Sequence, residues 1–348
     1  MTASHGRDIV VVAASAGGLE PLRTLLAALP ADFPASVLVV LHIPATGGRT
    51  LPRILDRAGP LSAEAAVDGE ALRPGRIYVA PPDLHLMVVD GWVRLSRGPR
   101  QNGVRPSADP LFRSAALYGG PRTVGVVLSG TLDDAALGAA TVEQRGGRVI
   151  VQDPADAAYG SMPSCALATT QHAEARAAGQ IAALLVDLAA QQAGPFLGPP
   201  PAELESEIHG LLASDPRIDP AARDYSGFTC PDCGGPLYHT PERGADSYDC
   251  LVGHRWSPES LLEEQGAAVE RAMWLAIRSL DERRRLTERL AAGARDQGHP
   301  ISAARFEAAS TEAALAADVI RDATGRMTPV TEEPVDDQLA GGEAKAGH

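Results

Sequence analysis

The sequence predicts an α/β protein with a doubly wound, mostly parallel, Rossmann-like sheet that also carries an antiparallel hairpin. From residue 8 to about residue 190, short apolar runs alternate with segments whose apolar residues keep helical spacing. Repeated alternation of this kind is typical of a parallel sheet with helices on both faces. Beyond residue 193 the composition changes twice, which predicts a small zinc ribbon followed by a helical hairpin.

Strands are expected where aliphatic or β-branched runs stop at glycine, proline or polar residues. The longest runs cover residues 8–13, 36–41, 123–128 and 148–152. Four shorter pieces lie between the second and third of these runs, at residues 63–67, 76–80, 84–89 and 92–96. Gly91 separates the last two pieces, so these should form a tight hairpin. We expect the shorter pieces to add an antiparallel element to the sheet.

Helices are expected where apolar residues recur every three or four positions. Within the α/β region these segments are 19–29, 51–58, 111–117, 134–145 and 178–190. The α/β domain should then cover residues 1–193. The later divisions are a linker with a short helix at 194–227, a zinc-ribbon-like module at 228–257, an α-helical hairpin at 258–326 and a disordered tail at 327–348. The apolar stripe of the hairpin, which includes Trp274, Leu275, Ile277, Leu286 and Leu290, is expected to form its core.

The composition is that of an ordinary globular protein with an acidic balance. The 348 residues are 45% hydrophobic and 22% charged, and the formal net charge is −13. This charge argues against nucleic acid or an anionic membrane as the main partner. No stretch approaches the roughly 20 apolar residues of a membrane span, and the short polar start at residues 1–8 does not look like a signal peptide. We therefore expect a cytoplasmic protein without membrane insertion.

Three polar residues follow three of the long apolar runs. Ser15 comes after the first run, His42 after the second, and Asp134 lies in the loop after the third. Functional sites of open α/β sheets form at the carboxyl ends of the strands, so these residues should meet at one edge. A serine, a histidine and an acid are the parts of a nucleophilic hydrolase, in which the imidazole takes the hydroxyl proton and the acid orients the imidazole.

Other interpretations of the same residues remain open. Ser15, Asp133 and Asp134 each precede a predicted helix, where a side chain commonly caps the first turn. A lone histidine after a strand is often structural. The turn that contains Ser15 is also a candidate for phosphate binding, although it lacks the glycine pattern of dinucleotide-binding turns and the Gly-Lys-Ser/Thr of a P-loop. The coincidence of three strand ends favours catalysis over three independent structural roles.

A second cluster combines cysteine and histidine at the spacing of a zinc site. Cys230 and Cys233 form a Cys-x-x-Cys pair, and Cys250 and His254 form a Cys-x-x-x-His pair after 16 intervening residues. Three thiolates and one imidazole fill a tetrahedral shell, so we expect a closed, structural Zn²⁺ site and no cofactor for catalysis. Free thiols or a redox pair are the alternatives. Cys165 stands apart and is expected in the core.

Several stretches of the α/β region agree in order and spacing with one known family. They lie at residues 12–18, 41–44, 68–70, 74–85, 105–112, 126–130, 152–154 and 161–163. On these motifs, residues 8 to about 190 resemble the catalytic domain of the chemotaxis protein-glutamate methylesterases, the CheB family. The resemblance covers more than half of the chain.

The resemblance implies a function and assigns roles to residues. The family's catalytic serine, histidine and aspartate fall on Ser15, His42 and Asp134. The implied reaction is hydrolysis of γ-glutamyl methyl esters on methyl-accepting chemoreceptor proteins, which releases methanol. Deamidation of receptor glutamines is implied as a second activity. The expected partners are therefore chemoreceptors, with a receptor methyltransferase as a further candidate, and no nucleic acid.

The chain departs from the family pattern beside the catalytic residues. Ala16 stands where the family usually has threonine, and residues 131–135 read Thr-Leu-Asp-Asp-Ala in place of Met-Gly-x-Asp-Gly. Backbone amides near Ala16 and Gly17, or at Thr131, are expected to hold the oxyanion, so the departure at Thr131 bears on rate. Family enzymes commonly carry a receiver domain ahead of the catalytic domain. The resemblance begins at residue 8 here, so we expect this chain to be regulated otherwise or not at all.

A non-catalytic function is the alternative that these departures leave open. A chain that keeps the fold but has lost rate would act as a signalling adaptor that binds receptors or a methyltransferase. Release of methanol from a methylated receptor distinguishes the esterase from the adaptor.

Overall fold

The computed structural model describes residues 6–42, 50–213, 224–242 and 245–326. The chain divides into two compact units at the boundary between Leu261 and Leu262. The first unit holds the α/β domain and the cysteine cluster, and the second holds most of the helical hairpin. The tail expected at 327–348 and part of the expected linker, at 214–223, lie outside the described residues.

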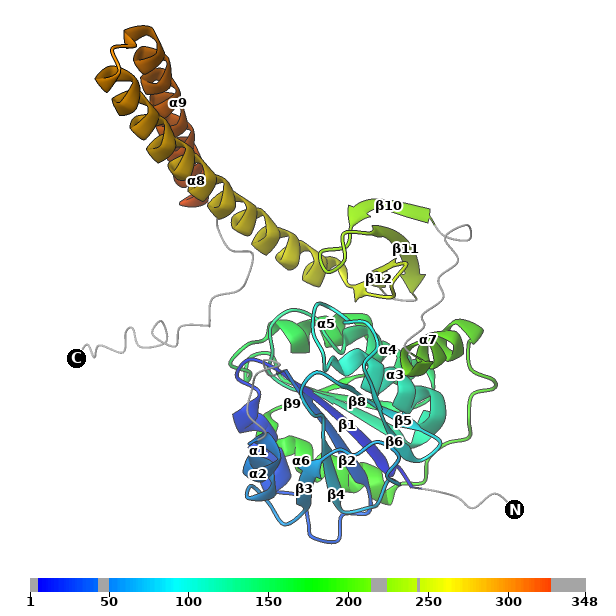
Figure 1. Cartoon of the computed structure of the whole chain (residues 1–348). Helices are drawn as coiled ribbons and strands as arrows, with labels where there is room; N and C mark the ends of the chain where they lie inside the picture. Colours follow the sequence, from blue (N-terminus) through cyan, green and yellow to red (C-terminus); the bar gives the residue numbers. More distant parts are fainter. Residues whose placement is uncertain (1–5, 43–49, 214–223, 243–244, 327–348) are drawn as a thin grey trace, which may run out of the picture. The chain divides into compact units, whose positions relative to one another are not determined.

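A seven-stranded parallel sheet forms the centre of the α/β domain (Figure 1). Every pairing within it is parallel. In spatial order the strands are β3 (Ser62–Ala65), β4 (Arg76–Val79), β2 (Ser36–Leu41), β1 (Ile9–Ala14), β7 (Thr123–Val127), β8 (Arg148–Gln152) and β9 (Glu174–Arg176). Strand β1 lies directly between β2 and β7. The carboxyl ends of these three strands are therefore neighbours at one edge of the sheet.

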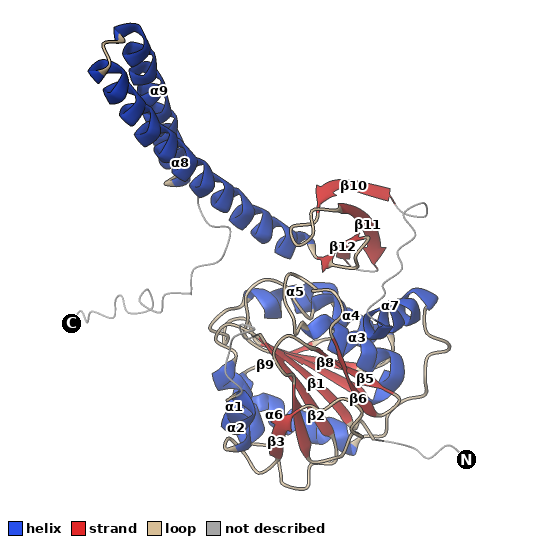
Figure 2. Cartoon of the chain, viewed as in Figure 1, coloured by secondary structure: helices blue, strands red, loops and turns tan. Residues whose placement is uncertain are grey.

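Helices cover both faces of this sheet (Figure 2). Val10 and Val12 of β1 point into one hydrophobic core, and Val11 between them points into the other. The first core is covered by α1 (Leu19–Ala27), α2 (Leu51–Asp56) and α6 (Ala178–Ala190), and the second by α3 (Ala108–Gly119), α4 (Ala136–Gln144) and α5 (Ser161–Thr169). A sheet buried on both faces needs nearly continuous apolar strands, as the sequence has. The predicted doubly wound fold is confirmed.

The shorter predicted strands separate into two groups. Strands β3 and β4 extend the parallel sheet at its edge. Strands β5 (His85–Val89) and β6 (Trp92–Ser96) form a separate antiparallel hairpin. The hairpin itself is confirmed, but the expectation that the shorter pieces add an antiparallel element to the main sheet is wrong. Leu86 and Val88 of the hairpin belong to the core beneath α3, so the hairpin covers a helix and does not lengthen the sheet.

The segment after residue 193 is held against the α/β domain. The Arg145 guanidinium donates hydrogen bonds to the carbonyls of Gly198 and Pro199. Helix α7 (Ala202–Ala213) buries three apolar side chains against Met87 and Leu117. A four-stranded antiparallel sheet follows, with β10 (Asp224–Thr229), β11 (Pro236–Glu242), β12 (Ala245–Cys250) and β13 (Arg255–Trp256). Its small core contains Trp256, which is 1% exposed.

The C-terminal helices, α8 (Pro258–Asp296) and α9 (Pro300–Thr324), are joined by the short turn that Gly298 and Pro300 predicted. Ile277 of the expected core stripe is buried, but Trp274, Leu275, Leu286 and Leu290 are between 44% and 58% exposed. Two helices cover only one face of each other, and the buried positions here are mostly alanine. None of the described helices has the length and apolar composition to cross a membrane.

Candidate active site

Ser15, His42 and Asp134 meet at the carboxyl edge of the three central strands. Ser15 follows β1, His42 follows β2, and Asp134 lies in the loop between β7 and α4. The register aligns Ala14 with Leu41 across β1 and β2, so the two residues after these strands come out side by side. The His42 imidazole thereby joins Ser15, 27 positions earlier in the chain, to Asp134, 92 positions later.

The imidazole of His42 contacts both other residues. Its Nδ1 lies 3.1 Å from Ser15 Oγ, and its Nε2 lies 2.7 Å from Asp134 Oδ2. An ionised carboxylate only accepts hydrogen bonds, so Nε2 carries the proton and Nδ1 is left to accept from the serine hydroxyl. This is the arrangement in which the imidazole can remove the serine proton while the acid holds the tautomer.

Asp134 is buried and surrounded by donors. In addition to His42, its carboxylate accepts from the Ala108 amide (2.6 Å), the Ser107 hydroxyl (2.7 Å) and the Asp109 amide (3.3 Å). Burial by itself raises the pKa of Asp134, but the hydrogen bond and charge of His42, together with the Ala108 and Ser107 donors, outweigh burial and lower that pKa to about 2. Asp134 is therefore ionised at neutral pH.

The capping interpretations of these residues are wrong. Helix α1 has Gly18 at its N-cap and α4 has Ala135, and neither helix has a side-chain cap. Ser15 therefore lies three residues before its cap position, with its hydroxyl directed to His42. The Asp134 carboxylate accepts hydrogen bonds from His42, Asn102 and residues 107–109 at the start of α3, and no side chain caps the first turn of α4. The side chains of Ser15 and Asp134 both hydrogen-bond to His42 instead.

His85 and Ser107 support the acid, and the sequence reasoning assigned neither of them a role. The Ser107 amide donates to His85 Nδ1, and His85 Nε2 donates to the Pro99 carbonyl 3.0 Å away. Complete burial, the largest cause, lowers the pKa of His85 to about 4, so the ring is neutral and its two nitrogens keep these distinct roles. Both residues stood in motifs of the family resemblance, which was the only signal in the sequence.

The loop that carries Asp134 has an unfavourable backbone. Leu132 has φ 59° and Ala135 has φ 77°, in the left-handed region that favours glycine. These are the positions at which the resembled family has its two glycines. Non-glycine residues here cost on the order of 1 kcal/mol each and persist only where surrounding contacts hold them. Asp133 supplies such contacts, because its Oδ1 accepts hydrogen bonds from the Ser257 and Ser260 hydroxyls.

The predicted oxyanion residues lie around the Ser15 turn. Ala16 is half-buried, and Gly17 adopts φ 67° at the start of α1. Within the described residues, the backbone amides of both have no acceptor. The Ser129 hydroxyl donates to the Ala16 carbonyl and fixes the turn. Thr131 is half-buried in the Asp134 loop, and no described hydrogen bond joins it to Ser15.

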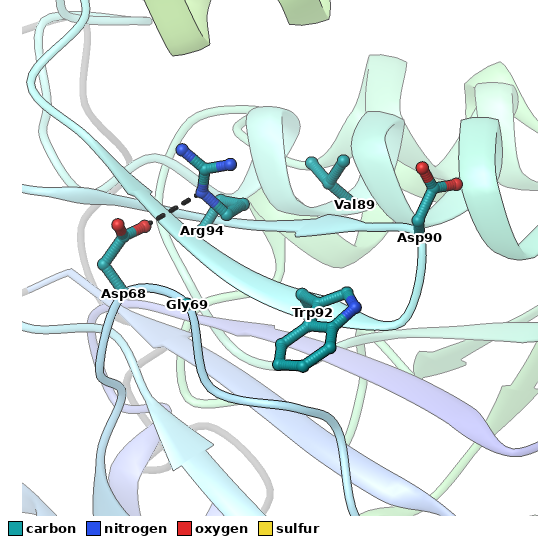
Figure 3. A pocket seen from close by; sticks show the side chains of 6 residues that line it. All are labelled: Asp68, Gly69, Val89, Asp90, Trp92 and Arg94. Atoms are coloured by element: carbon teal, nitrogen blue, oxygen red, sulfur yellow. Dashed lines mark hydrogen bonds and ion pairs between the residues drawn. The ribbon is translucent and has the colours of Figure 1, made fainter.

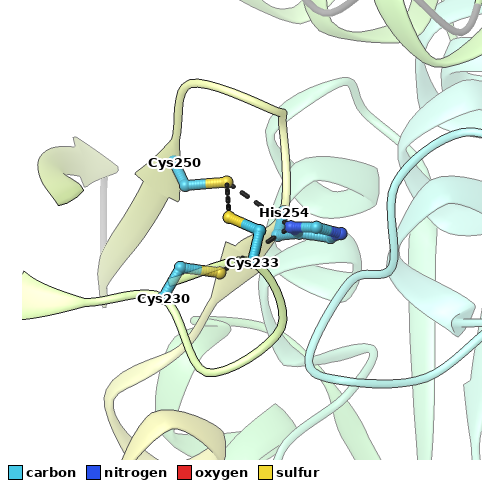
Figure 4. A group of neighbouring side chains, drawn as sticks. All are labelled: Cys230, Cys233, Cys250 and His254. Carbon is cyan, nitrogen blue, oxygen red and sulfur yellow. Dashed lines mark hydrogen bonds between the residues drawn. The ribbon is translucent and has the colours of Figure 1, made fainter. Parts of the chain in front are cut away.

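The four predicted metal ligands converge in the ribbon (Figure 4). The sulfur atoms of Cys230, Cys233 and Cys250 and a ring nitrogen of His254 all lie within 4.8 Å of one another. Contacts of 3.5–3.7 Å join His254 Nδ1 to two sulfurs and Cys233 to Cys250. Ligands about 2.3 Å from a tetrahedral zinc would be about 3.8 Å apart, so the donor set fits Zn²⁺. The other ring nitrogen, Nε2, lies 3.9 Å from Asp232, a carboxylate placed to orient the imidazole.

A hollow of about 480 Å³ lies elsewhere, beside the β5–β6 hairpin (Figure 3). Trp92 and Arg94 line it, and Arg94 pairs with Asp68 at a distance of 3.1 Å. None of the predicted site residues contributes to it. We attach no function to this hollow.

A family model described as CheB methylesterase matches residues 10–185 of the chain. A protein-glutamate methylesterase/protein-glutamine glutaminase of Caulobacter vibrioides is 43% identical over 173 residues, which cover 48% of this chain and 50% of that protein. A protein of the same description from Anaeromyxobacter dehalogenans is 44% identical over 162 residues, which cover 46% of this chain and 47% of that protein. The chain thus spans about half the length of the curated relatives that it matches.

Among solved structures, the Thermotoga maritima CheB methylesterase catalytic domain is 33% identical, with a TM-score of 0.49. The match covers 52% of this chain and 98% of that chain. The residues that the family model matches lie within the α/β domain.

Proposed function

The chain belongs to the CheB methylesterase family, whose model covers residues 10–185, and from this premise we propose that it is a serine carboxylesterase. Its substrates would be γ-glutamyl methyl esters of chemoreceptor proteins, which it hydrolyses to glutamate and methanol. The continuous hydrogen-bonded path from Ser15 Oγ through His42 to Asp134 supports this proposal most directly. The names of the two relatives also include glutaminase, which supports a second activity on receptor glutamines.

The proposed reaction has two steps. His42 Nδ1 removes the hydroxyl proton of Ser15 as its oxygen attacks the ester carbonyl, and the protonated imidazole then gives that proton to the leaving methoxide. Water, deprotonated by the same nitrogen, hydrolyses the acyl-enzyme and restores Ser15. Asp134 stays ionised throughout and stabilises the imidazolium. General acid–base assistance of this kind contributes about 10²–10⁴-fold in rate.

The oxyanion would be held beside the start of α1. The amides of Ala16 and Gly17, which have no acceptor among the described residues, are next to the attacking hydroxyl, at the helix end that carries positive partial charge. Thr131 is the remaining candidate, and its half-buried place in the Asp134 loop supports it less directly.

Replacement of Ser15 by alanine tests the esterase. Because the variant has no nucleophile, Ser15→Ala should lower methanol release from a methylated receptor fragment by at least about 10³-fold. The matched control is Ser62→Ala, at an exposed position of edge strand β3, which should leave the rate unchanged. Wild-type methanol release by Ser15→Ala would contradict the proposal.

The same assay separates the alternatives. A wild-type protein that binds the receptor fragment but releases no methanol would be the adaptor. Ammonia released from a fragment with glutamine at the methylation position would establish the glutaminase activity. We also propose a cytoplasmic location, with receptor tails as the partner and a receptor methyltransferase as a further candidate.

We further propose that Cys230, Cys233, Cys250 and His254 hold one structural Zn²⁺. The protein should purify with one zinc per chain, since so small a sheet needs metal to hold its fold. Cys230→Ser should lose the metal. Cys165→Ser, in helix α5 of the α/β domain, should retain it and serves as the matched control. Elemental analysis that finds no zinc in freshly purified, folded protein would refute the site.

A further inference from the structure

The end of the ribbon contacts the loops that hold the catalytic acid. The Asn102 amide donates to the Arg255 carbonyl at 2.8 Å, and the Ser257 amide donates to Asn102 Oδ1 at 2.9 Å. The hydroxyls of Ser257 and Ser260 donate to Asp133 Oδ1 at 2.8 and 2.9 Å. We call Arg255, Ser257 and Ser260 the ribbon base. They belong to the same compact unit as the active site.

This contact is buried and closely fitted. Ser257 and Ser260 are each 2% exposed, and Asp133 is 7% exposed. Trp256 is also buried, and a Cβ added to Gly103 would come within 3.1 Å of its ring. Without the two hydroxyl donors, the buried Asp133 carboxylate would lack these hydrogen bonds, which would cost folding free energy. The ribbon base therefore supplies partners that the α/β domain needs.

Two routes lead from the ribbon base to Asp134. Asn102 is the first, because its Nδ2 lies 3.5 Å from Asp134 Oδ1 and equally far from Asp109 Oδ2. Its backbone amide donates to the Arg255 carbonyl, and its Oδ1 accepts from the Ser257 amide. Asp133 is the second, because it precedes Asp134 in the chain. The two donors on Asp133 hold the loop in its unfavourable left-handed conformation at Leu132 and Ala135.

From this geometry we propose that the ribbon base is a positioning element of the esterase. Through Asn102 and Asp133, it holds the Asp134 carboxylate in line with His42. Asn102, Asp133 and Ser260 are thus positioning residues, which act on the reaction through Asp134. The proposal rests on the proposed esterase function for its kinetic readout.

Ser260→Ala in the full-length chain is the first test. Ser260 Oγ donates to Asp133, whereas Ser257 Oγ also accepts the Ser260 amide and caps α8, so Ser260 is the cleaner position. We expect kcat for methyl ester hydrolysis to fall about tenfold with KM unchanged within about twofold, because a misdirected acid affects the chemical step and leaves binding intact.

The matched control is Ser226→Ala, which removes a hydroxyl that bonds the Leu237 carbonyl inside the ribbon. It should leave kcat unchanged. If Ser260→Ala keeps wild-type kcat, or if Ser226→Ala lowers kcat equally, the proposal is overturned.

Asn102→Gly tests the route through Asn102, and it also covers the case in which Ser260→Ala does not fold. Asn102 has φ 52°, a conformation that glycine adopts without cost, and the backbone bond to Arg255 is kept. This variant should retain its zinc and also lose about tenfold in kcat. Retention of full kcat in folded Asn102→Gly would likewise count against the proposal.

Two readouts that need no receptor separate this inference from the esterase proposal. The first is the rate at which a fluorophosphonate labels Ser15, and the second is the proton resonance of His42 Nε2–H, which the short bond to Asp134 shifts downfield. Both should change in Ser260→Ala and Asn102→Gly. If the wild-type protein neither releases methanol nor is labelled, the esterase proposal is contradicted. If both variants label at the wild-type rate and keep the wild-type resonance position, the positioning role alone is contradicted.

Discussion

Asp133 and Asp134 are adjacent acids with opposite behaviour, and the difference comes from their donors. Asp134 accepts from an imidazole, a hydroxyl, two backbone amides and the Asn102 side-chain amide, and its pKa is lowered to about 2. Within the described part of the chain, the Asp133 carboxylate accepts from two hydroxyls alone. Burial, the largest cause, raises its pKa to about 7 despite them, and the charges of Glu259 and Asp134 act in the same direction. Asp134 is thus the acid suited to hold an imidazolium.

The raised pKa of Asp133 predicts a pH-dependent stability. Its folded-state value lies above the ordinary value of 3.8, so folded protein binds this proton more tightly than unfolded protein. The resulting stabilisation is complete below about pH 4 and is lost as the pH rises through 7. Asp133→Asn cannot titrate, so urea unfolding between pH 5 and 8 should show a smaller decline in the free energy of unfolding than wild type. Parallel declines in the two proteins would contradict the assignment.

The left-handed backbone of the acid loop predicts a stabilising change. Leu132→Gly removes the steric cost at φ 59°, so it should raise the free energy of unfolding by about 1 kcal/mol. Leu184→Gly is the matched control, since the same change in the middle of helix α6 should lower that free energy by about 1 kcal/mol or more. Chemical denaturation measures both. A destabilised Leu132→Gly would show that the side chain of Leu132 outweighs the backbone strain.

The positions of Ser15, His42 and Asp134 could be predicted because the carboxyl ends of parallel strands share one edge. The groups that hold the Asp134 carboxylate could not be predicted. The Ala108 and Asp109 amides leave no signature in the side-chain sequence, and Ser107 and His85 act through contacts that form only when α3 packs beside the loop. The hydroxyl donors to Asp133 were still harder to predict from the sequence, because they come from a different module.

At the scale of elements, periodicity predicted where strands and helices lie, and it did not predict their partners. The sequence placed the pieces that became β3 and β5 in one group of four short strands, yet β3 joins the parallel sheet and β5 forms a hairpin over α3. Pairing depends on which neighbour has an open edge, which no single run encodes. The same holds for the apolar stripe of α8. Its helical period predicts an apolar face, but it does not predict whether a second helix covers that face.

At the scale of the whole molecule, the two compact units predict how the chain tolerates truncation. A chain that ends at residue 264 keeps the α/β domain, the cysteine cluster and the ribbon base, so it should fold and retain full kcat. A chain that ends at residue 227 loses the donors to Asp133 and should retain the parallel sheet with about tenfold lower kcat. Circular dichroism and methyl ester hydrolysis measure both. Equal kcat in the two truncated chains would count against the ribbon base.

The distance along the chain between Asp133 and its two hydroxyl donors also has a consequence during protein synthesis. Ser257 and Ser260 follow Asp133 by 124 and 127 positions. A ribosome that adds about 5–20 residues per second reaches them roughly 6 to 25 seconds after Asp133. A nascent polypeptide can therefore assemble its sheet while translation continues, but Asp133 receives its two hydroxyl donors only once the distal module has been made.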